Sequence, residues 1–331
     1  MTDPKPDIFH KLATQVVRRY QANARKSMLD VYEVDRCFTN LENDNLEFVF
    51  SNRADVVAIL SNPEYALDLA RIFVRSSLEF TYNNNQFIEM DTGEKERLLS
   101  IYSSYLDGMN TILINSRNYT DFEKEFSTLV KDHFKDLSHN ISRFFDRENG
   151  WHVQENVILK QVVCSDYSPD FQLQLLGLDA IDLLQPVLDM GCGKNGTLVK
   201  HLRDRGIKAI GIDRLVSDEA GLREANWFDV DFKPESWGTI ISHMAFSNHF
   251  LFHHRYIHGK PGQYARLYMK ILRSLKPGGC FVYSPALPFI EQLLPSNQYS
   301  VSKQFIDNNT DGSNQKPEVV RVVNTGYQHV P

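Results

Sequence analysis

The stretch DMGCGKNG, from Asp189 to Gly196, decides how the second half of this 331-residue chain folds. Its three glycines have the spacing G-x-G-x-x-G, and the apolar run PVLDMG (186–191) leads into it. Glycine after a buried strand lets the backbone turn sharply and approach a ligand closely, and the following helix offers free N–H groups. The spacing alone suits NAD or another nucleotide cofactor, because such a motif in isolation is weak evidence.

A carboxylate two residues before the first glycine favours a cofactor that carries positive charge. Asp189 would project from the strand end beside the cofactor, where it would repel a pyrophosphate. S-adenosylmethionine has a sulfonium and an ammonium group and no phosphate, so it suits this position. Asp213 stands 20 residues after Gly193, where it could accept hydrogen bonds from the ribose hydroxyls of either cofactor class.

Short apolar runs alternate with amphipathic segments beyond Asn149-Gly150. We expect strands at 186–191, 208–214, 238–244 and 279–285, and helices at 196–206 and 262–275. This alternation predicts an α/β unit with a parallel sheet and helices on both faces. The last two apolar runs, 299–306 and 318–326, have only a polar linker between them. They predict an antiparallel pair at the sheet edge.

Four motifs at matching distances resemble those of class I S-adenosylmethionine-dependent methyltransferases. They read VLDMGCGKNG, GIDR, NWFDVDF and LKPGG, at 187–196, 211–214, 226–232 and 275–279. The resemblance covers the chain from about Tyr167 onward and implies S-adenosylmethionine as the cofactor. It also implies a seven-stranded, mostly parallel Rossmann-like sheet whose last strand is antiparallel.

The resemblance further implies which residues contact the cofactor. Asp189 would orient the methionyl ammonium group, and Gly191 and Gly193 would allow close backbone approach. Asp213 would bind the ribose, with Arg214 stacked near the adenine or pointing to solvent.

The remaining implied contacts each have a structural alternative. Asp229 would accept a hydrogen bond from the adenine amine, or be a simple loop carboxylate. Trp227, Phe228 or Val230 would pack on the adenine ring, and for Trp227 the alternative is a place in the core. Ser242 and His243 would lie near the methyl donor, since they end the fourth expected strand. Upstream, Tyr167 would cap the cofactor or pack on a helix.

A histidine-rich segment, 243–258, follows that strand and contains five of the eleven histidines. At the carboxyl edge of the sheet, such a segment lies where ligands bind. His249 and His253 are spaced i and i+4, so on a helix they share one face and are the candidate catalytic bases. This spacing also suits zinc, but no H-E-x-x-H motif and no evident third ligand are present, so we expect no metal. The alternative is a packing role.

Charge and cysteine content limit the function classes. The net charge is -6, and residues 1–150 carry all of the imbalance, with 18 Lys and Arg against 24 Asp and Glu. Neither half is basic, so we expect no DNA partner. Four scattered cysteines without a C-x-x-C pair favour a reducing, cytoplasmic setting. No apolar run is long enough for a membrane span.

Residues 1–150 predict an all-α domain of five to seven helices. The clearest helix, 121–145, has an apolar stripe with charges between its members. The stripe consists of Phe122, Phe126, Leu129, His133, Leu137, Ile141 and Phe144. We interpret this domain as a substrate cap or a dimerisation module, and residues 151–331 as the cofactor-binding domain.

The leading hypothesis is a methyltransferase whose acceptor is a small molecule rather than a macromolecule. Three alternatives stay open at this point. The chain could bind S-adenosylmethionine without catalysis, as a regulatory or scaffold subunit. It could methylate RNA or protein. It could also be an NAD(P)-dependent oxidoreductase, although Asp189 and the LKPGG turn argue against that class.

Overall fold

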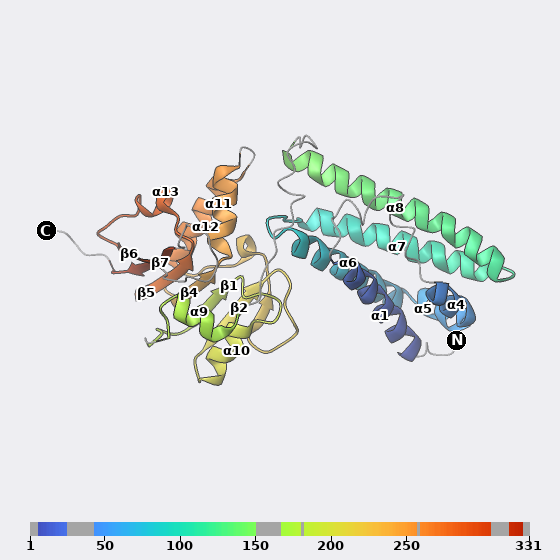
Figure 1. Ribbon diagram of the computed structural model, residues 1–331, viewed down its shortest axis with the longest axis horizontal. Coiled ribbons are helices and arrows are strands. Elements are labelled where there is room, and N and C mark those ends of the chain that lie inside the picture. Colours follow the sequence, from blue (N-terminus) through green and yellow to red (C-terminus); the bar gives the residue numbers. More distant parts are fainter. Residues whose placement is uncertain are drawn as a thin grey trace. The chain divides into compact units, whose positions relative to one another are not determined.

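The computed structural model describes residues 6–24, 43–149, 167–179, 182–256, 259–305 and 318–326. The chain divides into two compact units, Met1–Cys164 and Ser165–Pro331 (Figure 1). The composition change at Gly150, the polar linker 307–317 and His258 lie outside the described residues. No helix in the described ranges is long and apolar enough to cross a membrane.

The first unit is helical in every described segment, as the sequence predicts. Its described helices are α1 (Pro6–Ala22), α4 (Asn43–Ser51), α5 (Arg53–Leu60), α6 (Pro63–Asn84), α7 (Thr92–Asn115) and α8 (Tyr119–Asn149). Figure 1 shows α6, α7 and α8 as long neighbouring helices, and α1 packs along α6.

Local capping sets where two of the long helices begin. The Asn62 side chain accepts the Glu64 amide at 3.0 Å, and α6 starts at Pro63, directly after this cap. In α7, Asp91 accepts the Glu94 amide at 2.9 Å while the Glu94 carboxylate accepts the Asp91 amide. This capping box starts the helix at Thr92.

The predicted stripe of α8 faces the core of the helical unit. Its buried members are Phe122, Phe126, His133, Leu137 and Ile141. Leu129 is half-buried and packs on a neighbouring glycine: a Cβ built on Gly108 of α7 would lie 2.6 Å from Leu129 Cδ1. Only a residue without a side chain allows α7 and α8 to approach this closely.

The second unit is built on a seven-stranded sheet of order β3-β2-β1-β4-β5-β7-β6. Its strands are β1 (Val187–Met190), β2 (Ala209–Asp213), β3 (Leu222–Glu224), β4 (Trp237–His243), β5 (Leu275–Ser284), β6 (Tyr299–Phe305) and β7 (Glu318–Asn324). Strands β1 to β5 pair in parallel, and β7 is antiparallel to both β5 and β6. The predicted sheet and its antiparallel end are therefore confirmed.

Two apolar clusters cover the two faces of this sheet. Helices α11 (Phe246–Arg255) and α12 (Pro261–Arg273), with the short α13 (Pro288–Glu291), cover one face. Helices α9 (Pro169–Leu175) and α10 (Thr197–Asp204) cover the other. Leu188 packs in the first cluster and its neighbour Val187 in the second, as the alternation of side chains along a strand requires.

Candidate functional site

The strand register brings three segments of the sequence to one edge of the sheet. Asp189 of β1 is in register with the third residue of β2 and the fifth residue of β4. Two residues further on, Gly191, Asp213 and His243 therefore lie at the same level, at the carboxyl ends of three adjacent strands. This edge is where ligands bind in open parallel sheets.

The glycine loop between β1 and α10 is closely packed against the start of α11. Gly191 has φ +79°, and a Cβ built on it would lie 2.4 Å from the Cβ of Ala245 and 3.2 Å from Trp227 Cζ2. Both the backbone conformation and the close packing require glycine here. The loop then leads into α10, whose first residue is Thr197.

Asp213 holds this loop in place from the neighbouring strand. One carboxylate oxygen accepts the Gly193 amide at 3.1 Å, and the other accepts the Leu215 amide at 3.3 Å. A carboxylate can accept about four hydrogen bonds, so its remaining lone pairs can still accept from a ligand. The residue predicted to bind ribose thus also positions the glycine loop.

Asp189 is the most unusual group at this edge. Its side chain is 3% exposed, so its carboxyl group is almost completely removed from solvent. Burial, followed by repulsion from the Asp213 carboxylate, raises the pKa of Asp189 to about 7. A buried carboxylate in this position is poorly stabilised unless a positive charge lies beside it.

His243 and Asp189 project from the same face of the sheet. Asp189 pairs with Ile241, two residues before His243, and residues two apart on a strand share a face. Its imidazole is 8% exposed and contacts Tyr167 edge-to-face, with ring centroids 4.8 Å apart. Tyr167 is itself exposed and stacks on Phe171 at the start of α9. Burial lowers the pKa of His243 to about 4, so the imidazole is neutral near pH 7. Tyr167 therefore covers His243 at the edge of the site.

Ser242 points to the opposite face, toward α11. Its hydroxyl donates to the Met190 carbonyl at 2.9 Å and accepts the Phe246 amide at 3.0 Å. The side chain is completely buried. Its observed contacts connect β4, β1 and the start of α11.

The residues predicted around the adenine lie in and after the 3-10 turn Trp227–Asp229. Trp227 is buried in the core cluster beneath Gly191, and Phe228 packs edge-on against Tyr264 with ring centroids 5.1 Å apart. Asp229 is exposed. Arg214, which directly follows β2, is half-buried.

The two histidines predicted as bases lie on one face of α11, and both contact Tyr264 of α12. The Tyr264 hydroxyl is 3.5 Å from His249 Nδ1, and the His253 ring stacks on the Tyr264 ring at 4.7 Å. The Lys260 amide donates to His253 Nδ1 at 3.4 Å. Burial, with a smaller effect of the Arg214 charge, lowers the pKa of His249 well below its usual value. These contacts support the packing alternative. Within the described residues, no three His, Cys, Asp or Glu side chains cluster as a metal site would require.

Comparisons with known proteins give matches only among solved structures. Neither a family model nor a curated protein matches the chain. The N-methyltransferase NodS from Bradyrhizobium japonicum is 14% identical, with a TM-score of 0.34, over 47% of this chain and 94% of that one. A SAM-dependent methyltransferase from Methanosarcina mazei is 13% identical, with a TM-score of 0.31, over 45% and 95%. The plantazolicin methyltransferase BpumL, solved with SAH, is 12% identical, with a TM-score of 0.33, over 57% and 91%.

The fold assignment rests on the sheet itself. Five parallel strands in the order β3-β2-β1-β4-β5 are followed by β7, which is inserted antiparallel between β5 and β6. The second unit has the class I methyltransferase fold. The resemblance in sequence motifs and the observed topology therefore agree.

Sequence reasoning missed one residue at the edge of this methyltransferase fold. Met244, directly after β4, has φ +54°, a left-handed conformation that is rare for a non-glycine residue. The Asn248 side chain donates to the Met244 carbonyl at 2.8 Å and supports this turn. Both side chains are partly exposed. No local signal identifies Met244, because methionine is not a residue type that favours this conformation.

Proposed function

We propose that this chain is an S-adenosylmethionine-dependent methyltransferase that acts on a small-molecule acceptor. The observation that carries the proposal is the buried Asp189 carboxyl group, whose pKa is raised to about 7 by burial and by the Asp213 carboxylate. A ligand with an ammonium group and a sulfonium would supply the positive charge that this pair of carboxyl groups requires. A pyrophosphate would be repelled there, which disfavours a dinucleotide.

The groups around Asp189 suit the other parts of this cofactor. Asp213 would accept from the ribose hydroxyls while it holds the loop, and Gly191 and Gly193 would allow the backbone to approach the cofactor. Arg214, Phe228 and Asp229 would lie on the adenine side. Trp227 would support the glycine loop by packing beneath it. Ser242 would hold the start of α11 in place through its hydrogen bond with the Phe246 amide.

Methyl transfer depends mainly on proximity and in-line orientation of the acceptor. His243 would hold the acceptor by a hydrogen bond to its neutral imidazole, and Tyr167 would cover this contact. With a pKa of about 4, His243 is a weak base at pH 7. The proposal therefore favours an acceptor that is nucleophilic without a strong base, such as a neutral amine. The helical unit would act as a substrate cap or hold together a homodimer.

Isothermal titration calorimetry with S-adenosylhomocysteine tests cofactor binding. The unsubstituted chain should bind, and Asp213→Ala should weaken binding about 10- to 100-fold, the range expected when a charged hydrogen-bond acceptor is lost. The matched control is Asp218→Ala, which removes an exposed carboxylate five residues away and should bind normally. If the folded chain does not bind S-adenosylhomocysteine, the proposal is wrong.

A second experiment tests the class of acceptor. Radiolabelled S-adenosylmethionine is incubated with the protein and with separated small-molecule, RNA and protein fractions of a cell extract. The proposal expects the labelled methyl group in the small-molecule fraction. Label in RNA or protein would show that the acceptor is a macromolecule and not a small molecule. Binding of S-adenosylmethionine without any methyl transfer would favour a regulatory or scaffold role.

A further inference from the structure

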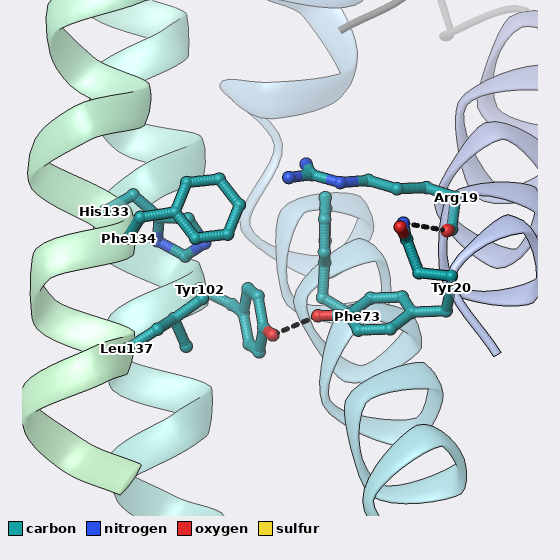
Figure 2. Close-up of a pocket in the computed structure, with 8 residues that line it drawn as sticks. Arg19, Tyr20, Phe73, Tyr102, His133, Phe134 and Leu137 are labelled. Carbon is teal, nitrogen blue, oxygen red and sulfur yellow. Dashed lines mark hydrogen bonds between the residues drawn. The ribbon is translucent and has the colours of Figure 1, made fainter. Parts of the chain in front are cut away.

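A small cavity lies inside the helical unit, apart from the methyltransferase fold. It is lined by the end of α1 and by α6, α7 and α8 (Figure 2). The lining residues are Arg19, Tyr20, Asn23, Phe73, Tyr102, His133, Phe134 and Leu137. The cavity volume is about 20 Å³. One water needs about 10–15 Å³ on this scale, so the cavity has room for one or two water-sized groups.

His133 brings an unpaired polar atom to this cavity. Its side chain is 6% exposed, and its Nδ1 is buried without a hydrogen-bond partner. The ring stacks on Tyr105 with centroids 4.4 Å apart. Burial, together with the Arg19 charge, lowers the pKa of His133 to about 3, so the imidazole is neutral. An unpaired buried nitrogen costs about 1–3 kcal/mol, and a bound acceptor or donor would remove that cost.

Arg19 supplies a fixed positive charge on the other side of the cavity (Figure 2). Its guanidinium carbon lies 5.0 Å from the centre of the Phe134 ring. Among the described residues, no carboxylate forms an ion pair with Arg19. A planar guanidinium presents parallel N–H donors that match the two oxygens of a carboxylate.

We propose that the helical unit binds a small monocarboxylate in this cavity, between the Arg19 guanidinium and the His133 imidazole. The carboxylate accepts hydrogen bonds from Arg19, and one of its oxygens accepts the N–H of the His133 Nδ1 tautomer. Phe73 and Phe134 form apolar walls of the cavity. A volume for one or two water-sized groups limits the ligand to the smallest carboxylates, such as formate and acetate.

Calorimetry of the full chain with formate and with acetate as probes tests the site. The expected result is saturable binding that becomes at least about tenfold weaker in Arg19→Gln and in His133→Phe. The matched control is Arg18→Gln, which removes the adjacent, exposed arginine of α1 and should keep the affinity. His133→Phe preserves the ring packing and removes the unpaired nitrogen, so its thermal midpoint should be unchanged or higher.

Three outcomes would overturn the site: no saturable binding of either probe, equal loss in Arg18→Gln, or equally tight binding of inorganic phosphate. S-adenosylhomocysteine binding is measured on the same samples and should be the same in all three variants. A failure of the carboxylate site is thereby separated from a failure of the proposed methyltransferase function.

Discussion

Asp189 and Asp213 lie on neighbouring strands at the same edge of the sheet, but they are stabilised very differently. Asp213 accepts two backbone amides, from Gly193 and Leu215. Asp189 is 3% exposed, and its pKa is raised to about 7 by burial and by Asp213. The Asp213 carboxylate therefore holds the loop, while the charged form of Asp189 is destabilised by burial and by Asp213.

Asp189→Asn should raise stability and abolish cofactor binding together. In the folded protein Asp189 titrates near 7, against 3.8 for an unperturbed carboxyl, so the native state holds a proton that the unfolded state loses between these values. Stability consequently falls as the pH rises through this window, and ionisation costs on the order of a few kcal/mol above pH 7. Asparagine removes this cost. Thermal melts should show the variant more stable at pH 8 and nearly equal to the unsubstituted chain at pH 4.

The affinity of the unsubstituted chain for S-adenosylmethionine should also depend on pH. Binding that requires ionised Asp189 weakens about tenfold for each pH unit below 7, once the carboxyl group is protonated. Calorimetry between pH 5.5 and 8 measures this slope. A pH-independent affinity would show that Asp189 does not pair with the cationic part of the cofactor.

Gly191→Ala should be far more damaging than the same change at Gly206. Both glycines have positive φ, +79° and +77°, so alanine is strained at either position. A Cβ at Gly191 would overlap the Cβ of Ala245, whereas nothing lies within 4 Å of one at Gly206. We expect a loss of about 1 kcal/mol for Gly206→Ala, and several kcal/mol with loss of S-adenosylhomocysteine binding for Gly191→Ala. Urea unfolding and calorimetry measure both, and equal losses would contradict the packing argument.

Periodicity and glycine placement predicted six of the seven strands, because each of these strands is a local pattern. They did not predict β3, Leu222–Glu224, since only three residues pair there and two of them are exposed. The LKPGG motif was expected as a turn before the fifth strand, yet β5 begins at Leu275. The pairing of β5 with β4 is interrupted by a register shift between Trp237 and Thr239 of β4. Irregular pairing of this kind leaves no periodic signal.

For the site, the sequence predicted only which residues lie at the carboxyl ends of the strands. Strand order placed Asp189, Asp213 and His243 at one edge, and the register confirms it. The partners of each side chain come from distant segments and cannot be deduced from local spacing. Tyr167, just before α9, packs on His243 although it lies far away in the sequence. Likewise, Tyr264 of α12 contacts His249 and His253 of α11.

Ser242→Ala should destabilise the second unit by about 1–3 kcal/mol. The change removes a buried hydroxyl and leaves the Met190 carbonyl and the Phe246 amide without this partner. The control is Ser302→Ala on the exposed edge strand β6, which should change stability by less than about 0.5 kcal/mol. Urea unfolding followed by tryptophan fluorescence reports on this unit through Trp227 and Trp237. Equal effects of the two substitutions would contradict the bridging role of Ser242.

His243→Phe should make the second unit less sensitive to acid. The folded-state pKa of His243 is about 4, against an ordinary 6.5, so below pH 6.5 the unfolded state binds a proton that the native state does not. Stability is therefore lost as the pH falls from 6.5 to 4, by about 1.4 kcal/mol per pH unit for one histidine. Phenylalanine keeps the ring contact with Tyr167 and removes this proton.

The measurement is the free energy of unfolding of both proteins at several pH values between 4 and 7. The difference in favour of His243→Phe should grow as the pH falls. His254→Phe is the matched control on α11, because it removes an exposed histidine and phenylalanine can keep the ring stacking on Phe289. Parallel pH profiles for His243→Phe and the unsubstituted chain would show that His243 is already charged in the folded protein, and the neutral imidazole proposed to hold the acceptor would then be ruled out.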